Sequence, residues 1–190
     1  MADRQDLPER LPLHLLKDQV IFPLVVLPLF VSEGEMAAIE AAMKDRHLVA
    51  AVACGAGGAR AWEELPRIGT LCRIKQVLRF PEGGGKMVIE GLRRIRLVAC
   101  SRRHSFFEAE VTAIEEQESG GLVAEALVQS IHALLKIALA YGRPLPGDVL
   151  KMIDRIEEPG RLADLVAVYL NLDLAAQQRL LETLDPLARL

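Results

Sequence analysis

An apolar run interrupted by two prolines, residues 20–31, most restricts the folds open to this chain. The run reads VIFPLVVLPLFV and contains Pro23 and Pro28. It is too short to span a bilayer as a helix, which takes about 20 residues, and proline removes the backbone donor that a helix interior requires. The pattern therefore predicts extended chain with sharp bends: a first strand ending at Ile21, a corner at Phe22-Pro23, and a second extended piece entering a core.

A helix is expected immediately after this run. Ser32 and Glu35 have the spacing of a capping box, in which the two side chains satisfy unpaired amides of the first helical turn. Downstream, apolar residues recur at three- and four-residue spacing, at Met36, Ile39, Ala42 and Met43. The spacing predicts an amphipathic helix to about Lys44, with one apolar face on a sheet. A bent strand followed by a capped helix indicates a small mixed barrel.

Further strands are predicted from apolar runs and alternation, at residues 11–16, 47–54, 68–80, 86–90, 94–100 and 107–114. Within 68–80, one parity is expected to face inward, namely Cys72, Ile74, Gln76, Leu78 and Phe80. Residues 81–85 predict a hairpin, and Gly91 a bulge or tight bend. We therefore expect an α+β fold that begins with a small β-barrel of about six strands and one helix.

The composition changes at residues 115–121, an acidic joint (EEQESGG) after which no strand pattern follows. This change predicts two subdomains, residues 1–118 and 119–190. The second is expected to be a helical bundle, with helices at about 123–141, at 147–156, from Pro159 and after Asp173. The first of these helices should bury one apolar stripe, made of Val123, Leu127, Ile131, Leu134, Ala138 and Tyr141, and end at Gly142.

The last residues repeat a helix-start signal. Asp185-Pro186 combines an N-cap residue with a proline at the first helical position, but only LARL follows. So short a segment does not hold a helix by itself. We therefore expect that the chain is cut as a further helix begins; a frayed natural terminus is the alternative.

The composition argues against several functions. A net charge of -3 provides no overall attraction to nucleic acid or to an anionic membrane, and 4% aromatic residues are few for base stacking. Cys54, Cys72 and Cys100 lie in apolar runs and are expected to be reduced, buried thiols. The N-terminus carries acidic residues without an apolar segment behind them, so we expect no secretory signal and a cytoplasmic protein.

No catalytic residue, metal site or cofactor is expected. The glycine clusters at 55–58 and 83–85 do not lead into the Gly-Lys-Ser/Thr of a phosphate-binding loop. There is no paired Cys/His zinc motif and no Gly-x-Ser-x-Gly elbow. Glu108 and Glu110 share one face of a strand, but the alternation makes that face the solvated one.

One basic stripe is the only feature that suggests nucleic acid. It consists of Arg93, Arg94, Arg96, Arg102, Arg103 and His104. Ion pairs with Glu90, Glu108 and Glu110 on neighbouring strands explain it as a solvated barrel face. A nucleic-acid surface is the alternative.

Several motifs, in order, resemble the N-terminal domain of the Lon family of ATP-dependent proteases. They are VIFP (20–23), LPLFV (27–31), IGT (68–70), EGLRR (90–94), EEPGRLAD (157–164) and LETL (181–184). The resemblance covers nearly the whole chain, from about Leu11 to Leu190. It implies a PUA-like barrel with a helix and then a helical bundle. In the family a long helix, an ATPase and a serine-lysine peptidase follow, and these are absent here.

The resemblance also implies a function. In the family this region helps to recognise unfolded or damaged polypeptides, supports assembly of a homo-hexamer and has no catalytic residues. The expected partners are therefore unfolded polypeptides and the remaining domains of a Lon-like protease, with no membrane or nucleic acid. The alternatives are a freestanding Lon-N-like protein that binds a peptide or protein, and a PUA-like RNA-binding domain.

Recognition of unfolded chains requires exposed apolar surface that tolerates many sequences. Corners and hairpin ends of the expected barrel supply candidates. The expected substrate-binding residues are Phe22, Pro23, Leu24, Phe80, Pro81, Met87 and Phe106. Ordinary core packing is the alternative for each of them.

Overall fold

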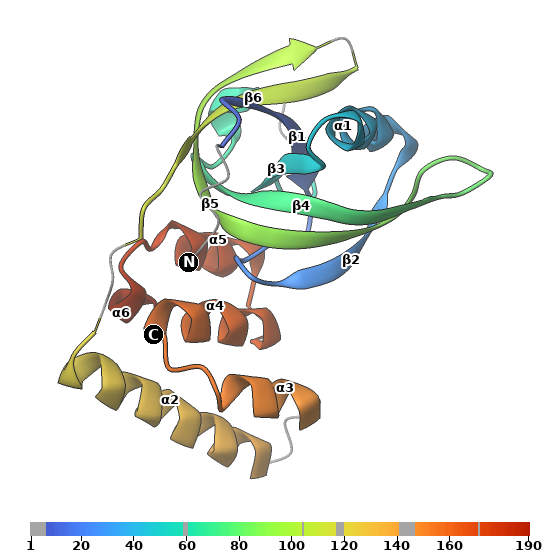
Figure 1. Ribbon diagram of the computed structural model, residues 1–190. Helices are drawn as coiled ribbons and strands as arrows, with labels where there is room; N and C mark the ends of the chain where they lie inside the picture. Colours follow the sequence, from blue (N-terminus) through green and yellow to red (C-terminus); the bar gives the residue numbers. More distant parts are fainter. Residues whose placement is uncertain (1–6, 59–60, 104, 117–119, 141–146, 171) are drawn as a thin grey trace. The chain divides into compact units, whose positions relative to one another are not determined.

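The structure, a computed structural model, describes residues 7–58, 61–103, 105–116, 120–140, 147–170 and 172–190 (Figure 1). It separates into two units, Met1–Ile114 and Glu115–Leu190. The first unit holds the strands, and the second holds helices. The boundary predicted after residue 118 lies outside the described residues.

The first unit is built on one six-stranded sheet. Its strands are β1 (Arg10–Leu16), β2 (Val26–Val31), β3 (Leu48–Ala53), β4 (Ile68–Arg79), β5 (Gly85–Arg103) and β6 (Phe106–Ala113). The order is β2-β5-β4-β3-β1-β6, and β6 also pairs with β5, so five strands close into a ring and β2 remains at its edge. β1 and β3 are parallel, and the other pairs are antiparallel. The expected mixed α+β fold with six strands is confirmed.

Strand β3 explains how this sheet forms two cores. Its sequence, LVAAVA, is buried at every position. Val49 and Ala51 pack in a cluster with helix α1 (Glu33–Lys44), whereas Ala50 and Val52 pack in a second cluster. Both faces of the strand are therefore covered, which is why its residues form a continuous apolar run rather than an alternation.

In strand β4, the set of residues predicted to face inward is only partly correct. Cys72 and Ile74 are buried as expected, but Gln76 and Leu78 are exposed. The register with β5 shifts between Ile74 and Gln76. Because such a bulge inserts one residue, it reverses the faces of all later side chains. Val77 consequently packs against the core instead.

Strand β5 is continuous, whereas the sequence predicted two strands divided at Gly91. The register with β4 does shift at this point, between Leu71 and Cys72. A side chain at Gly91 would collide with the carbonyl oxygen of Phe22. The glycine therefore permits another segment to approach the strand closely, and the strand itself continues.

The strand predicted at residues 11–16 is confirmed as β1, whereas the predicted strand ending at Ile21 does not form. β1 ends at Leu16, and Ile21 lies outside any strand although it is buried.

The helix prediction was accurate: α1 begins at Glu33, directly after Ser32, and ends at Lys44. The Ser32 amide donates to Glu35 Oε2 at 2.8 Å, and its hydroxyl donates to the same oxygen. A short 3-10 helix, Trp62–Glu64, precedes β4.

The second unit contains α2 (Leu122–Ala140), α3 (Gly147–Ile153), α4 (Pro159–Tyr169), α5 (Leu174–Glu182) and α6 (Pro186–Arg189). Its core includes Val128, Ile153, Ile156 and Leu162. The predicted stripe of α2 is corrected, because Val123 and Leu134 are exposed and Ala124, Val128 and His132 are buried. Tyr141 and Gly142 lie outside the described residues. Within the described ranges, no helix has the length and apolar composition needed to cross a membrane.

Helix α6 is held by its surroundings. The Leu187 amide donates to Asp185 Oδ1 at 2.9 Å, which caps the helix. Arg189 is buried, donates to Glu116 Oε2 at 2.7 Å and to the Thr183 carbonyl at 3.0 Å. These tertiary contacts explain how so short a helix persists.

Candidate functional site

A tight turn at residues 22–25 projects the first candidate side chain. The Val25 amide donates to the Phe22 carbonyl at 3.4 Å, and Pro23, with its fixed φ, occupies the second position of the turn. The third position is Leu24, with φ at 63°. Such a φ usually requires glycine. Leu24 is nevertheless 57% exposed, so burial does not account for a leucine at this position.

Two hydrogen bonds from β5 hold this turn. The Leu24 amide donates to the Gly91 carbonyl at 2.8 Å, and the Gly91 amide donates to the Val25 carbonyl at 2.9 Å. Here Leu24 and Val25 together oppose Gly91, which is the arrangement of a bulge. The left-handed conformation of Leu24 is thus imposed by the sheet.

Strand β2 continues this apolar surface. Val26, Pro28 and Phe30 are exposed, while Leu29 and Val31 face the core. Phe30 is the most exposed of them, at 79%. Its ring lies 5.9 Å from Lys86 Nζ on β5. One face of β2 is therefore apolar and uncovered.

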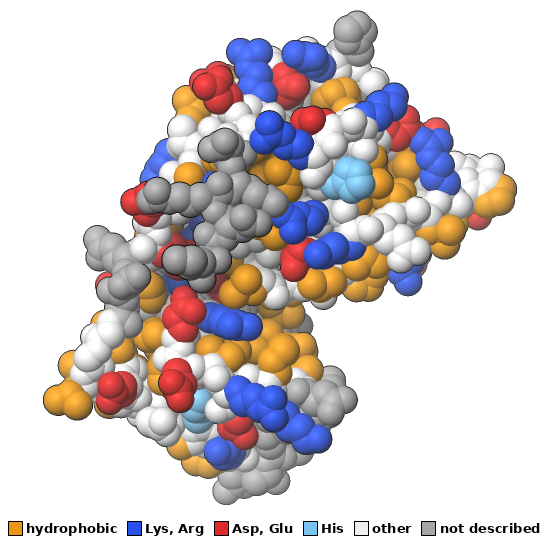
Figure 2. Space-filling view, in the orientation of Figure 1, with side chains coloured by type: hydrophobic (Ala, Val, Ile, Leu, Met, Phe, Trp, Pro, Cys, Tyr) orange, Lys and Arg blue, Asp and Glu red, His pale blue; other side chains and the backbone are white. Residues whose placement is uncertain are grey.

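The exposed surface extends across three strands. Phe30 on β2 is aligned with Lys86 on β5, which is aligned with the exposed Leu78 on β4. We name Leu24, Val26, Pro28, Phe30 and Leu78 the outer strip. Figure 2 shows hydrophobic side chains at the surface near the protruding β4–β5 hairpin, with charged side chains between them. Exposed apolar groups gathered on a sheet are typical of an interaction surface.

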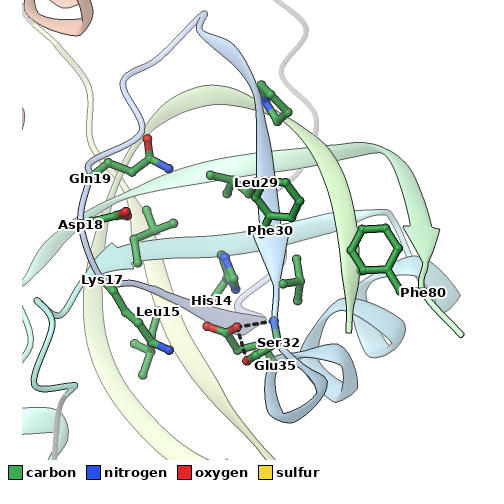
Figure 3. Close-up of a pocket in the computed structure, with 14 residues that line it drawn as sticks. His14, Leu15, Lys17, Asp18, Gln19, Leu29, Phe30, Ser32, Glu35 and Phe80 are labelled. Atoms are coloured by element: carbon green, nitrogen blue, oxygen red, sulfur yellow. Dashed lines mark hydrogen bonds between the residues drawn. The ribbon is translucent and has the colours of Figure 1, made fainter. Parts of the chain in front are cut away.

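A groove adjoins the outer strip. It has a volume of about 470 Å³ and lies between residues 14–19 and residues 28–32, with Glu35, Phe80 and Gly85 completing its lining. In Figure 3, Lys17, Asp18 and Gln19 lie on one side, Phe30 lies on β2, and His14 lies between them. The volume is within the range of ordinary ligand sites.

The floor of the groove contains a buried imidazole. His14 is 3% exposed, and its Nδ1 has no hydrogen-bond partner among the described residues. Burial lowers the pKa of His14, so the side chain is neutral at pH 7. Burial alone would raise the pKa of Glu35, but hydrogen bonds from Ser32 outweigh it and lower that pKa. The floor therefore combines a neutral imidazole with an ionised carboxylate.

The structure separates the predicted substrate-binding residues. Phe22 and Met87 are 1% and 0% exposed, so no ligand reaches them in the folded unit, and the prediction is corrected at both. They fill the core because the bend at Pro23 and the inward parity of β5 direct them there.

The other five predicted residues are at least partly exposed, and they stay a prediction. Pro23 and Leu24 share the turn, and Phe80 and Pro81 share the β4–β5 hairpin. Phe80 also lines the groove. Phe106 is opposite Arg103 in the β5–β6 hairpin, which is a different part of the sheet.

Sequence reasoning missed Val26, Pro28, Phe30 and Leu78. The run 26–31 is apolar at both parities, so an uncovered apolar face on β2 could have been inferred once β2 was known to be an edge strand. Leu78 could not, because its exposure depends on the bulge.

The basic stripe is only partly the solvated face that was predicted. Arg94 is buried. Arg103 Nε lies 3.1 Å from Glu108 Oε2, as the ion-pair interpretation requires. Glu90 instead pairs with Lys75, at 2.7 Å.

The described residues contain no group of three His, Cys, Asp or Glu side chains arranged to hold a metal. The three cysteines are free thiols, of which Cys72 is buried and Cys54 and Cys100 are half-buried. Burial raises the pKa of the Cys72 thiol, which keeps it protonated and unreactive.

An exposed apolar strip on a sheet, next to a groove, is typical of a domain that binds another molecule. The chain belongs to the family of ATP-dependent protease La (LON) substrate-binding domains, whose sequence model matches residues 10–190. In this family the domain is non-catalytic.

Individual relatives agree with this assignment. Lon protease from Citrifermentans bemidjiense is 44% identical over 186 residues, which is 97% of this chain and 23% of the relative. Lon protease from Desulfatibacillum aliphaticivorans is 35% identical over 196 residues, 100% of this chain and 24% of the relative. The chain thus spans about a quarter of the length of these proteases.

Solved structures show the same fold. The N-terminal domain of a Mycobacterium avium complex Lon protease has a TM-score of 0.74 at 26% identity, covering 95% of this chain and 93% of that one. A Lon N-terminal domain protein from Xanthomonas campestris has a TM-score of 0.67 at 16% identity, covering 95% and 94%.

Proposed function

We propose that this chain is the recognition part of a cytoplasmic Lon-like protease, binding unfolded or damaged polypeptides and supporting hexamer assembly. In this proposal a PUA-like barrel carries the binding surface and a C-terminal helical bundle follows it. The outer strip binds apolar segments that folded proteins bury. Pro23, Phe80 and Pro81 add apolar contacts at its margins, and Phe106 adds one on the β5–β6 hairpin.

Leu24 is the observation that carries the proposal. Its side chain is mostly exposed, and its φ is one that favours glycine. A non-glycine residue in this conformation costs about 1 kcal/mol or more. A function for the exposed side chain explains why the position holds a leucine, since stability does not.

The test compares two triple variants. In the first, Leu24, Val26 and Phe30 are replaced by serine; in the second, Leu122, Met152 and Val168 of the helical unit are replaced by serine. All six residues are exposed. The probe is fluorescent, reduced and carboxymethylated α-lactalbumin, which is permanently unfolded, and its folded form is the control.

We expect the first variant to bind the unfolded probe at least about tenfold more weakly, equivalent to about 1.4 kcal/mol. The second variant should bind as the unsubstituted chain does. Equal binding by all three chains, with their folds intact by circular dichroism, would contradict the proposal. Binding should persist at high salt, because apolar contacts are not screened.

Salt dependence also distinguishes RNA binding, the alternative function, from binding of unfolded polypeptides. Single-stranded RNA bound through Arg102 and Arg103 would be released steeply as salt rises. For a freestanding Lon-N-like protein, the gene would lack ATPase and peptidase sequences beyond this chain.

One observation supports a role in assembly. Helix α2 exposes Val123, Leu134 and Ile137 beside the face that carries its buried residues. Between them, the Ser130 hydroxyl donates to the Ala126 carbonyl at 2.8 Å, so it does not require another partner. Residues 123, 127, 130, 134 and 137 alternate in steps of four and three, the spacing of a helix-pairing seam.

Replacing Leu134 and Ile137 by glutamate should abolish any concentration-dependent self-association of the chain in sedimentation experiments. Gln129→Glu, on the same helix outside the seam, should not. If the unsubstituted chain remains monomeric at millimolar concentration, and full-length hexamers tolerate the glutamates, α2 does not support assembly.

A further inference from the structure

The free edge of β2 borders the groove. β2 is the end strand of the sheet order and pairs with β5 alone among the described strands. The hydrogen bond from the Gly91 amide to the Val25 carbonyl fixes which residues of β2 direct their backbone groups toward β5 and which direct them away. In an antiparallel pair, every second residue directs its backbone groups away from the partner strand. Val26, Pro28 and Phe30 therefore direct theirs away from β5.

Two observations agree with this alternation. Pro28 has no amide hydrogen, and proline is tolerated in a strand where that hydrogen would point to the free edge. Ser32, the next residue in the series, donates its amide to Glu35 rather than to β5. The groove-lining part of the edge thus offers the Pro28 carbonyl and both backbone groups of Phe30.

We propose that an extended segment of an unfolded polypeptide pairs with this edge as an added strand, lying in the groove between β2 and residues 14–19. The inference rests on the proposed function and specifies how the substrate is held. Every polypeptide carries the backbone groups that such pairing uses, so the mode tolerates any sequence except proline at the paired position. This tolerance is what recognition of unfolded chains requires.

The dimensions and lining of the groove fit one short strand. Residues 28–32 border it, four of them in β2, which corresponds to about 16 Å of extended chain. Phe30 and Phe80 supply apolar contacts beside the paired backbone. The buried His14, whose Nδ1 has no hydrogen-bond partner among the described residues, lies beneath it. Pro28 limits pairing at one end and protects the edge against aggregation.

The test separates the Phe30 amide from the Phe30 ring. Phe30→Ala removes the ring and keeps the amide hydrogen; Phe30→Pro removes both. Proline should be accommodated because this amide is not in the ladder with β5. Val26→Ala and Val26→Pro form the control pair, because Val26 lies on the same edge but does not line the groove. The probe is again carboxymethylated α-lactalbumin.

We expect Phe30→Pro to bind about three- to tenfold more weakly than Phe30→Ala, the typical effect of one hydrogen bond. Val26→Pro and Val26→Ala should bind equally. Pro28→Val restores an amide at the edge and should strengthen binding about threefold. Equal binding by Phe30→Ala and Phe30→Pro would overturn strand addition and leave the outer strip as the recognition surface. Absence of binding by the unsubstituted chain would overturn both proposals.

Hydrogen exchange provides a second readout that needs no substitution. The Phe30 amide should exchange more slowly when the probe is bound, and amides of β3 should be unchanged. If Phe30→Pro does not fold, this measurement decides, since an unprotected Phe30 amide in the bound state rejects strand pairing.

Discussion

Replacing Leu24 by glycine in one variant and by alanine in another tests the backbone strain that the turn places on this residue. Both substitutions remove the branched end of the side chain, so they should weaken binding of unfolded protein about equally. They differ in the backbone, because φ at position 24 is 63°. Alanine in this conformation is less stable than glycine by about 1 kcal/mol. Leu24→Gly should therefore be more stable than Leu24→Ala by about that amount.

Val26 is the matched control for this comparison. It is similarly exposed and lies in regular strand two residues later. There glycine lowers stability by about 0.5–1 kcal/mol relative to alanine. The sign of the glycine-alanine difference should therefore reverse between positions 24 and 26.

The assay is urea denaturation followed by fluorescence of Trp62, which lies in the first unit and is the single tryptophan of the chain. Arg67 stacks over its ring at 3.7 Å, so unfolding should change its emission. If Leu24→Gly is less stable than Leu24→Ala, as at position 26, the turn does not impose a strained conformation and the functional argument from Leu24 fails.

Two further predictions concern buried ionisable groups. Arg189 Nε lies 3.5 Å from the buried Asp164, and Arg189 also pairs with Glu116. Arg189→Met removes this cation and should lower the free energy of unfolding of the second unit by about 3–5 kcal/mol. Adding Asp164→Leu to this variant should restore part of the lost stability. A loss below about 1 kcal/mol by circular dichroism would contradict this. For His14, the folded pKa lies below the ordinary 6.5, so the unfolded chain binds more protons between these two pKa values. The stability that the neutral His14 contributes is therefore present above pH 6.5 and is lost as pH falls below 6.5 toward the folded pKa. In His14→Leu, the urea midpoint should change less between pH 7.5 and 5.5 than in the unsubstituted chain. An equal change of the midpoint with pH in both chains would refute this prediction.

The candidate site could be predicted only in part. The turn at Pro23 and the position of Leu24 beside it follow from a proline in an apolar run. The exposure of Leu24 does not, because it depends on the close approach of Gly91 to the turn. Phe22 and Met87 are as apolar as Leu24 in sequence, yet they lie in the core.

Local signals determined the elements themselves. A capping box at Ser32 and Glu35, and capping aspartates at Asp173 and Asp185, act within four residues, so the beginnings of α1, α5 and α6 are encoded where they occur. The acidic joint and the motif order likewise indicated a two-part chain of the Lon family.

Only the tertiary structure decided which side of each element is covered. The bulge after Ile74 forms where β4 meets β5 and reverses the later side chains. Helix α2 is apolar around most of its circumference, so its periodicity does not distinguish the buried Val128 from the exposed Leu134. Register and burial depend on partners distant in sequence, and no local pattern contains them.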